Sequence, residues 1–272
     1  MKKLLFLLPI LTLFSFNKEK LSDPIKKHLK AYAKIPEGDA FIKQRKVHVD
    51  EFYISKTETT NQEYVAFLED IKSTNPELYQ KSLPDTTVWS SKENVNQGFV
   101  NAYLRHPGFR TSPVVGISYR QAENYCKWIE TKLNENLNEG LKIKVSLPTE
   151  AEWVRAARGD EHTKIFTWGG PYLQDSKGKA LANFKKENIK YLNELRTSAP
   201  ERNLFTASVF SFAPNKFGVY QMCGNVAELT KEPDTIKGGA WDTNADELQI
   251  DAKNDLKAPS KSVGFRIAVK IL

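Results

Sequence analysis

The sequence predicts a single α+β domain with much irregular backbone, and three observations favour this fold class. Several stretches begin like capped helices and continue with apolar residues at helical intervals, whereas a few short segments alternate as strands do. Long stretches between them carry few periodic signals, residues 72–111 and 171–207 above all. The 272 residues can bury one large core, and no repeat or long linker divides them.

Three helices are expected because the same pattern marks their starts. Each begins with a capping-box pair, in which a hydroxyl residue is followed three residues later by Glu or Gln. The pairs are Thr60 with Glu63, Ser118 with Gln121, and Thr149 with Glu152. Apolar residues follow each pair at helical spacing, so each helix is expected to bury one face.

One strand is expected over residues 46–54. Val47 and Val49 alternate with polar residues, and Phe52 and Ile54 repeat the alternation after a slip in register. Residues 17–34, in contrast, are polar and rich in lysine. We expect them to form a flexible lead-in or a short surface helix ahead of a domain that spans residues 35–272.

Residues 1–16 have the pattern of a secretory signal peptide. A basic start, Met1 to Lys3, precedes the apolar run LLFLLPILTLFSF, which is short for a transmembrane helix. We therefore expect export to the periplasm or cell envelope, with cleavage after Phe16. An uncleaved anchor is the alternative, and only then would the protein be an integral membrane protein.

The charge pattern argues against a nucleic-acid partner. The formal net charge of +7 is modest, and the lysines between residues 177 and 190 have no aromatic residues interleaved at a spacing suited to stacking bases. A solvated face is the favoured reading. Contact with an anionic envelope polymer is the open alternative.

The two cysteines, Cys126 and Cys223, are interpreted as buried thiols. Cys126 lies on the apolar stripe of the second expected helix, and an apolar site raises the pKa of a thiol and makes it unreactive. A single disulfide between the two is the alternative, because an exported protein permits one.

The stretch from 208 to 229 is interpreted as an ion-binding turn. Gly224-Asn225 breaks a short apolar segment, and Gln221 and Glu228 bracket the break with side-chain oxygens. A hard cation such as Ca²⁺ takes six to eight oxygens from carboxylates, amides and main-chain carbonyls.

The run FAPNKFGVYQMCGNVAEL at 212–229 resembles the core motif of the sulfatase-modifying-factor family, which includes the formylglycine-generating enzyme. Six other segments resemble the family in the same order along the chain. These are FYISKTETTNQEYVAFL (52–68), SPVVGISYRQAENYCKWI (112–129), VSLPTEAEWVRAARG (145–159), FTWGG (166–170), KGGAW (237–241) and VGFRIA (263–268). The resemblance implies a C-type-lectin-like fold, with helices around small twisted antiparallel sheets.

The resemblance also implies two structural calcium sites. The first would use Asn183, Phe184, Glu201 and Asn203, and the second would use Gln221, Gly224, Val226 and Glu228. Relatives have Asp at the place of Glu201, and Asp or Asn at the place of Gln221. A retained calcium site and a vestigial turn therefore both remain open.

The catalytic site of the family is absent from the sequence. Enzymes of the family bind Cu(I) through two cysteines, and soft thiolates select this ion. The resemblance places those cysteines at Thr243 and Leu248, which cannot replace them. We therefore expect no copper and assign no catalytic residue.

The resemblance leads to a binding protein as the first functional hypothesis. PDTTVW (84–89) and HPGF (106–109) are similar to the gliding-motility and type IX secretion lipoproteins of the family. We expect an exported, non-catalytic protein with a protein partner in the envelope. The alternatives are an oxidase of the formylglycine-generating type that acts on a cysteine of a sulfatase or other protein, and a glycan-binding module.

Overall fold

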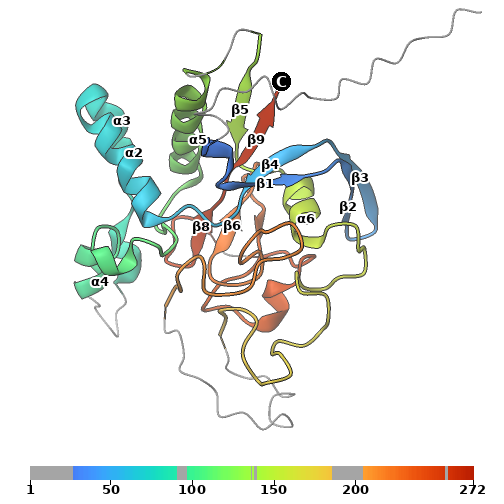
Figure 1. Ribbon diagram of the computed structural model, residues 1–272. Coiled ribbons are helices and arrows are strands. Elements are labelled where there is room, and N and C mark those ends of the chain that lie inside the picture. The colour runs from blue at the N-terminus through green and yellow to red at the C-terminus, as the bar shows by residue number, and fades with distance from the viewer. Residues whose placement is uncertain (1–26, 91–96, 136, 138–139, 186–204, 255–256) are drawn as a thin grey trace, which may run out of the picture.

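The computed structural model describes residues 27–90, 97–135, 137, 140–185, 205–254 and 257–272. Its central sheet joins the two ends of the described chain (Figure 1). The strand order is β1 (Tyr32–Ile35), β4 (Phe52–Ser55), β9 (Ala268–Ile271) and β5 (Ile143–Ser146), and all neighbours are antiparallel. The last strand of the chain thus lies in the middle of the sheet, between an early strand and a central one.

The expected strand at 46–54 is two strands that belong to different sheets. Gly38–Ile42 (β2) and Arg45–Val49 (β3) form a two-stranded hairpin, whereas β4 joins the central sheet. The slip in the alternation falls at the break between β3 and β4. Within the expected lead-in 17–34, Tyr32 pairs with Ser55, so the last residues of that segment form part of the central sheet.

A third, smaller sheet positions the candidate site. It has the order β7 (Ile236–Lys237), β6 (Ala227–Leu229) and β8 (Val263–Phe265). The β6–β7 pair is antiparallel as expected, but β6 and β8 run parallel, which the resemblance did not lead us to expect. A parallel pair needs a long connection, and here residues 230–262 supply it.

All three expected helices are present with their capping boxes. They are α2 (Asn61–Thr74), α5 (Tyr119–Asn134) and α6 (Glu150–Arg158). In each, the cap hydroxyl accepts from the backbone three residues on, and the Glu or Gln there accepts from the cap backbone. As expected, Cys126 lies on the buried face of α5. The buried residues of this helix are Ala122, Tyr125, Cys126, Ile129 and Leu133.

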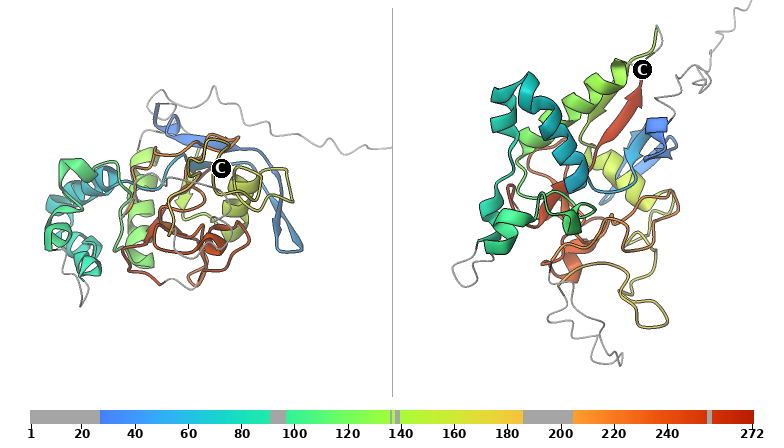
Figure 2. Two further views of the ribbon diagram at one scale, coloured as in Figure 1. Left: turned by 90° about the horizontal axis from the view of Figure 1, so that it is seen from below. Right: turned by 60° about the vertical axis from the view of Figure 1, so that its left-hand side comes forward.

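The stretch 72–111 carries few periodic signals, yet it contains short helices. These are α3 (Pro76–Ser82), α4 (Gln97–Ala102) and two 3-10 helices, Thr86–Trp89 and Pro107–Phe109. Together with α2 they form one flank of the molecule, and the β2–β3 hairpin lies on the opposite flank (Figure 2). Among the described residues, no helix combines the length and the apolar character that crossing a membrane requires.

Candidate functional site

Asn225 is the centre of the turn that the sequence singled out. It is fully buried and has a φ of 67°, in the left-handed region that Asn tolerates better than most residues. Its N–H donates to the Asn183 carbonyl (2.8 Å), its carbonyl accepts from the Trp241 N–H (2.9 Å), and its side-chain oxygen accepts from the Ala207 N–H (2.7 Å). Its side-chain NH₂ donates to Glu58 (2.9 Å). One residue therefore ties together four segments that are distant in sequence.

Glu228 forms a buried ion pair three residues further on. Its two carboxylate oxygens accept from Arg266 Nε and Nη2, at 2.6 Å each, and both residues are fully buried. Trp153 Nε1 donates to the same carboxylate at 2.7 Å. Arg266 also donates to the carbonyls of Ser55 and Tyr220. Each of the two charges is therefore compensated by the other and by further hydrogen bonds, as a buried ion pair requires.

Glu58 adds a second buried carboxyl group to this network. Burial raises its pKa to about 8, the charge of Arg266 lowers it in part, and that of Glu228 raises it. One of its oxygens accepts from Asn225, and the other is buried without a hydrogen-bond partner in the described part of the chain. Glu58 is therefore the titratable member of the network near neutral pH.

Thr243 is a structural residue within a tight turn. Its hydroxyl accepts from the Ala240 N–H (2.8 Å) and donates to the Ala240 carbonyl (3.1 Å). Its own N–H donates to the same carbonyl. These contacts use the side chain to close the turn that leads into the 3-10 helix Ala245–Leu248.

Leu248 ends that helix and is fully buried. It packs in the same apolar cluster as Trp153, Met222, Cys223 and Ile250. An isobutyl group in such a cluster contributes to stability through burial and packing, and it has no metal-binding atom.

An aromatic cluster lies beside this turn. Trp241 contacts Phe205 (ring centroids 6.2 Å apart), which contacts Phe99 (4.3 Å), and Phe99 stacks on Trp89 (5.1 Å). Trp89 and Phe99 belong to the stretch 72–111. That stretch therefore packs its own aromatic side chains against the residue two positions before Thr243.

Both cysteines are free and buried, as predicted. Burial raises the pKa of the Cys223 thiol to about 11, although a hydrogen bond with Thr167 lowers it in part. Burial also raises the pKa of Cys126 well above its ordinary value. Neither thiol is a ready nucleophile or metal ligand at neutral pH.

The second predicted calcium set is only partly open to a cation. Gln221 keeps a buried side-chain oxygen without a partner among the described residues, which suits a cation. Glu228 does not suit a cation, because Arg266 already neutralises its charge. The described residues contain no group of three or more His, Cys, Asp or Glu that could hold a metal. Gln221, Gly224, Val226 and Glu228 therefore fit calcium poorly and remain a prediction.

Only two of the four residues of the first predicted calcium set lie in the part of the chain that the structure describes. Asn183 and Phe184 are buried beside the turn, and the Asn183 side chain donates to the Phe205 carbonyl and to the Asn225 side-chain oxygen. Glu201 and Asn203 lie outside the described residues, as does the expected signal peptide, so this set also stays a prediction.

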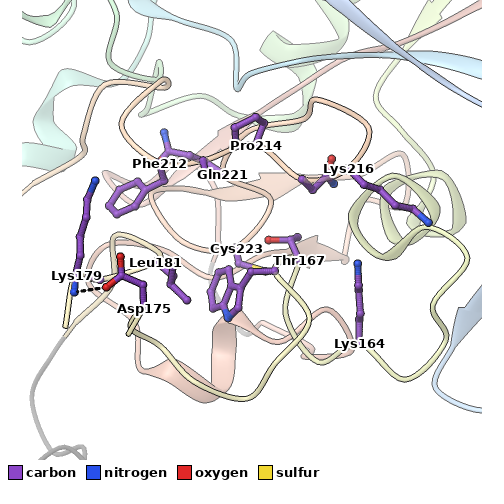
Figure 3. A pocket seen from close by; sticks show the side chains of 14 residues that line it. Lys164, Thr167, Asp175, Lys179, Leu181, Phe212, Pro214, Lys216, Gln221 and Cys223 are labelled. Carbon is purple, nitrogen blue, oxygen red and sulfur yellow. Dashed lines mark hydrogen bonds between the residues drawn. The ribbon is translucent and has the colours of Figure 1, made fainter. Parts of the chain in front are cut away.

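Two pockets flank the network. One, of about 350 Å³, is lined by Lys164, Thr167, Lys179, Gln221 and Cys223 among others (Figure 3). The other, of about 410 Å³, lies between the start of β1, the end of β4, α2 and α5, and its lining includes Glu58. Both have the volume of small-molecule sites.

Comparison with known proteins decides the family. The family model described as "Sulfatase-modifying factor enzyme 1-like domain" matches residues 26–271. The chain belongs to this family. The α+β, single-domain fold is that of the formylglycine-generating enzyme family, as the sequence predicted, and the likeness to solved structures agrees with it. For example, variable protein 1 of Treponema denticola superposes with a TM-score of 0.57 over 87% of this chain and 94% of that one, at 18% identity.

Curated relatives of this sulfatase-modifying-factor-type protein carry different names. The formylglycine-generating enzyme of Bos taurus is 28% identical over 222 residues, 73% of this chain and 53% of the relative. The chaperone protein LppX of Paenibacillus barcinonensis is 26% identical over 254 residues, 85% of this chain and 86% of the relative. This chain thus spans about half the length of the Bos taurus enzyme and most of the chaperone.

Sequence reasoning missed most of the buried network of this family member. Glu58, Trp153, Asn225 and Arg266 all lie in segments that carried the resemblance, but no role was assigned to them. Arg266 and Glu228 are 38 positions apart, so no local spacing rule pairs them. Their residue types could have indicated the pairing. Both are charged residues within apolar segments, and charged residues are rarely buried unless they are paired.

Proposed function

We propose that this protein is an exported, non-catalytic member of the family that acts by binding a protein partner in the cell envelope. The observation that carries the proposal is the use of the two copper-ligand positions. The Thr243 hydroxyl closes a turn on Ala240, and Leu248 fills an apolar cluster. The side chains at both positions make contacts that stabilise the local structure, and a pair of thiolates would remove these contacts. Neither side chain is a soft ligand for Cu(I).

The relatives support a binding role. The chaperone LppX is matched along most of its length, whereas the formylglycine-generating enzyme is matched along about half. A chaperone acts by binding other proteins. The PDTTVW and HPGF segments favour a gliding-motility or type IX secretion assembly as the setting, and their aromatic residues Trp89 and Phe109 pack within the flank of the molecule that the stretch 72–111 forms.

Export is part of the proposal and rests on the pattern of residues 1–16. The proposal includes no copper, because positions 243 and 248 carry no thiolate. It keeps structural calcium only as what the resemblance implies, because Arg266 already neutralises Glu228 in the second calcium set. Cell fractionation tests export directly: the protein should separate with the envelope fractions. Recovery in the cytoplasmic fraction alone would contradict it.

The binding function is tested by capture of a partner from envelope extract. The tagged full chain, crosslinked before cell lysis, should retain one protein in stoichiometric amount, identified by mass spectrometry. An unrelated exported protein with the same tag, crosslinked and captured in the same way, serves as the control. Failure to retain any protein above that control would count against a binding role.

The oxidase alternative makes the opposite prediction. Copper-dependent O₂ consumption with a cysteine-containing sulfatase peptide would replace the binding function with catalysis. We expect none, because the described thiols are buried with raised pKa values.

A further inference from the structure

The pocket of about 350 Å³ is built by three loops that meet above the turn at 221–225. Residues 164–168, 175–181 and 212–216 supply its walls, and Gln221 and Cys223 complete the lining (Figure 3). Figure 3 shows Lys164 and Lys179 rising on opposite sides of the opening. The pocket therefore combines cationic rims with a polar group from the buried turn.

Gln221 provides a hydrogen-bond acceptor that the described residues leave open. Its side chain is nine-tenths buried, at 7% relative exposure for the residue, and its NH₂ group donates to the Ser208 carbonyl at 2.9 Å. The amide oxygen has no partner within the described chain. Its φ of 50° lies in the left-handed region, which is unusual for a residue other than Gly, Asn or Asp. A buried acceptor on strained backbone indicates a group kept for a ligand.

Other polar groups of the lining already form hydrogen bonds within the protein. Asn215 uses both ends of its amide, because the NH₂ donates to the Ala156 carbonyl and the oxygen accepts from the Val219 N–H. Asp175 accepts from two backbone N–H groups of its own turn. Thr167 forms its hydrogen bond with Cys223. A ligand with many hydroxyl groups, such as a sugar, would therefore find few partners here.

The three lining lysines differ in how they are paired. Lys164 pairs with Glu161 at 2.8 Å, and Lys216 pairs with Asp160 at 3.2 Å. The Lys179 ammonium has no carboxylate within ion-pair distance among the residues that the structure describes. It is therefore the cation best placed to take an anionic group from solution.

Apolar side chains complete the lining. Trp168, Leu181 and Phe212 contribute to it together with Ala180 and Pro214. The Trp168 ring stacks on Phe166, with centroids 4.9 Å apart and planes 11° from parallel, so its orientation is fixed before a ligand arrives. A rigid aromatic wall of this kind suits an apolar side chain.

We propose that this pocket binds the carboxyl-terminal end of a peptide whose last residue is apolar. The peptide N–H donates to the Gln221 oxygen, the terminal carboxylate faces Lys179, and the apolar side chain packs among Trp168, Leu181 and Phe212. Within the described part of the chain, the Gln221 oxygen is an open acceptor and the Lys179 ammonium has no carboxylate at ion-pair distance. Together with the apolar walls, these two groups match the three parts of this ligand. The inference rests on the proposed binding function and names the part of the partner that is bound.

The test uses a fluorescein-labelled hexapeptide that ends in phenylalanine, with either a free carboxylate or an amide at its end. Fluorescence anisotropy with the full chain, in EDTA, should show binding of the acid form about tenfold or more tighter than the amide form. Lys179→Gln should weaken the acid form by a similar factor and leave the amide form unchanged. The matched control is Lys177→Gln, which removes an exposed lysine of the same turn that does not line the pocket.

A further variant tests the pocket independently of Lys179. Ala180→Phe places a ring in the pocket from an ordinary loop position and should abolish binding of both peptides, with circular dichroism unchanged. Equal affinity for acid and amide peptides, no effect of Lys179→Gln, or no binding up to about 1 mM would each overturn the proposal. If the Lys179→Gln variant captures a partner as strongly as the wild type does, the proposed peptide site is wrong, whereas the proposed binding function still stands.

Discussion

Two turns of this protein lie side by side and are built with opposite chemistry. The turn at 224–228 is held by two polar side chains: Asn225 joins four segments, and Glu228 pairs with the buried Arg266. The turn at 240–248 is closed by one hydroxyl and one isobutyl group, Thr243 and Leu248. The Trp241 N–H donates to the Asn225 carbonyl and connects the two turns.

The difference indicates which of the two turns the fold depends on more. Irregular backbone leaves N–H and C=O groups that no sheet or helix satisfies, and the polar turn satisfies them. The second turn needs only to be closed and filled. We therefore expect positions 243 and 248 to accept any residue that still closes the turn or fills the cluster, whereas positions 225, 228 and 266 require their own polar groups.

The largest expected effect is at the polar turn. Arg266→Met leaves Glu228 buried without its counter-ion and should lower the free energy of unfolding by about 3–5 kcal/mol. Urea denaturation measures this loss. Arg120→Met, which removes an exposed partner of Glu123, is the control and should change stability by less than about 1 kcal/mol. A loss of similar size in both variants would show that the buried Glu228–Arg266 pair stabilises the fold no more than an exposed pair does.

At the second turn, Leu248→Ala should cost about 2–5 kcal/mol, because it leaves a cavity in a packed cluster. Leu248→Met, which nearly conserves volume, should cost less than about 1.5 kcal/mol. Denaturation of both variants under the same conditions separates packing from any other role. Unchanged stability in Leu248→Ala would show that this position does not serve the fold.

The pH dependence of stability tests the titratable member of the network. The pKa of Glu58 is raised from 4.5 to about 8, so its contribution is fully present below pH 4.5 and is lost as pH rises through 8. Between these values it should lower the free energy of unfolding by up to about 1.4 kcal/mol per pH unit. Glu58→Gln should remove that slope. Parallel curves for wild type and variant between pH 5 and pH 8 would contradict the assignment.

Calcium should have the smallest effect. Because Arg266 neutralises Glu228, we expect about 5 mM CaCl₂ to raise the melting temperature by less than about 4 °C, equivalent to roughly 1 kcal/mol. Scanning calorimetry in calcium and in EDTA measures the difference. A rise well beyond that range, absent in Gln221→Leu, would show that the second calcium set is a strong site.

Local features of the fold were predictable from the sequence, and distant pairings were not. The capping boxes at 60, 118 and 149 placed three helices because cap and helix are adjacent in the chain. Helix α3 had a signal that was overlooked, since Asn75 caps it and Pro76 occupies its first turn. The helix α4, with six residues, is too short for a periodic pattern.

The candidate site was predictable only in part. The resemblance placed Thr243 and Leu248, and the structure explains what they do. Among the residues that the structure describes, the Gln221 oxygen has no hydrogen-bond partner and the Lys179 ammonium has no paired carboxylate, and both properties result from packing. Whether a polar atom finds a partner depends on loops from 164 to 216 that meet only in the folded chain.

Copper-dependent oxygen consumption shows whether this protein is a catalyst or a binding protein. The purified full chain is supplied with Cu(I) and a cysteine-containing peptide, and O₂ uptake is followed with an electrode. Because Thr243 and Leu248 offer no thiolate, we predict uptake no faster than that of copper and peptide alone. Catalytic uptake above that background would contradict it, and loss of that uptake when Cys126 and Cys223 are both replaced by serine would assign the copper to those thiols.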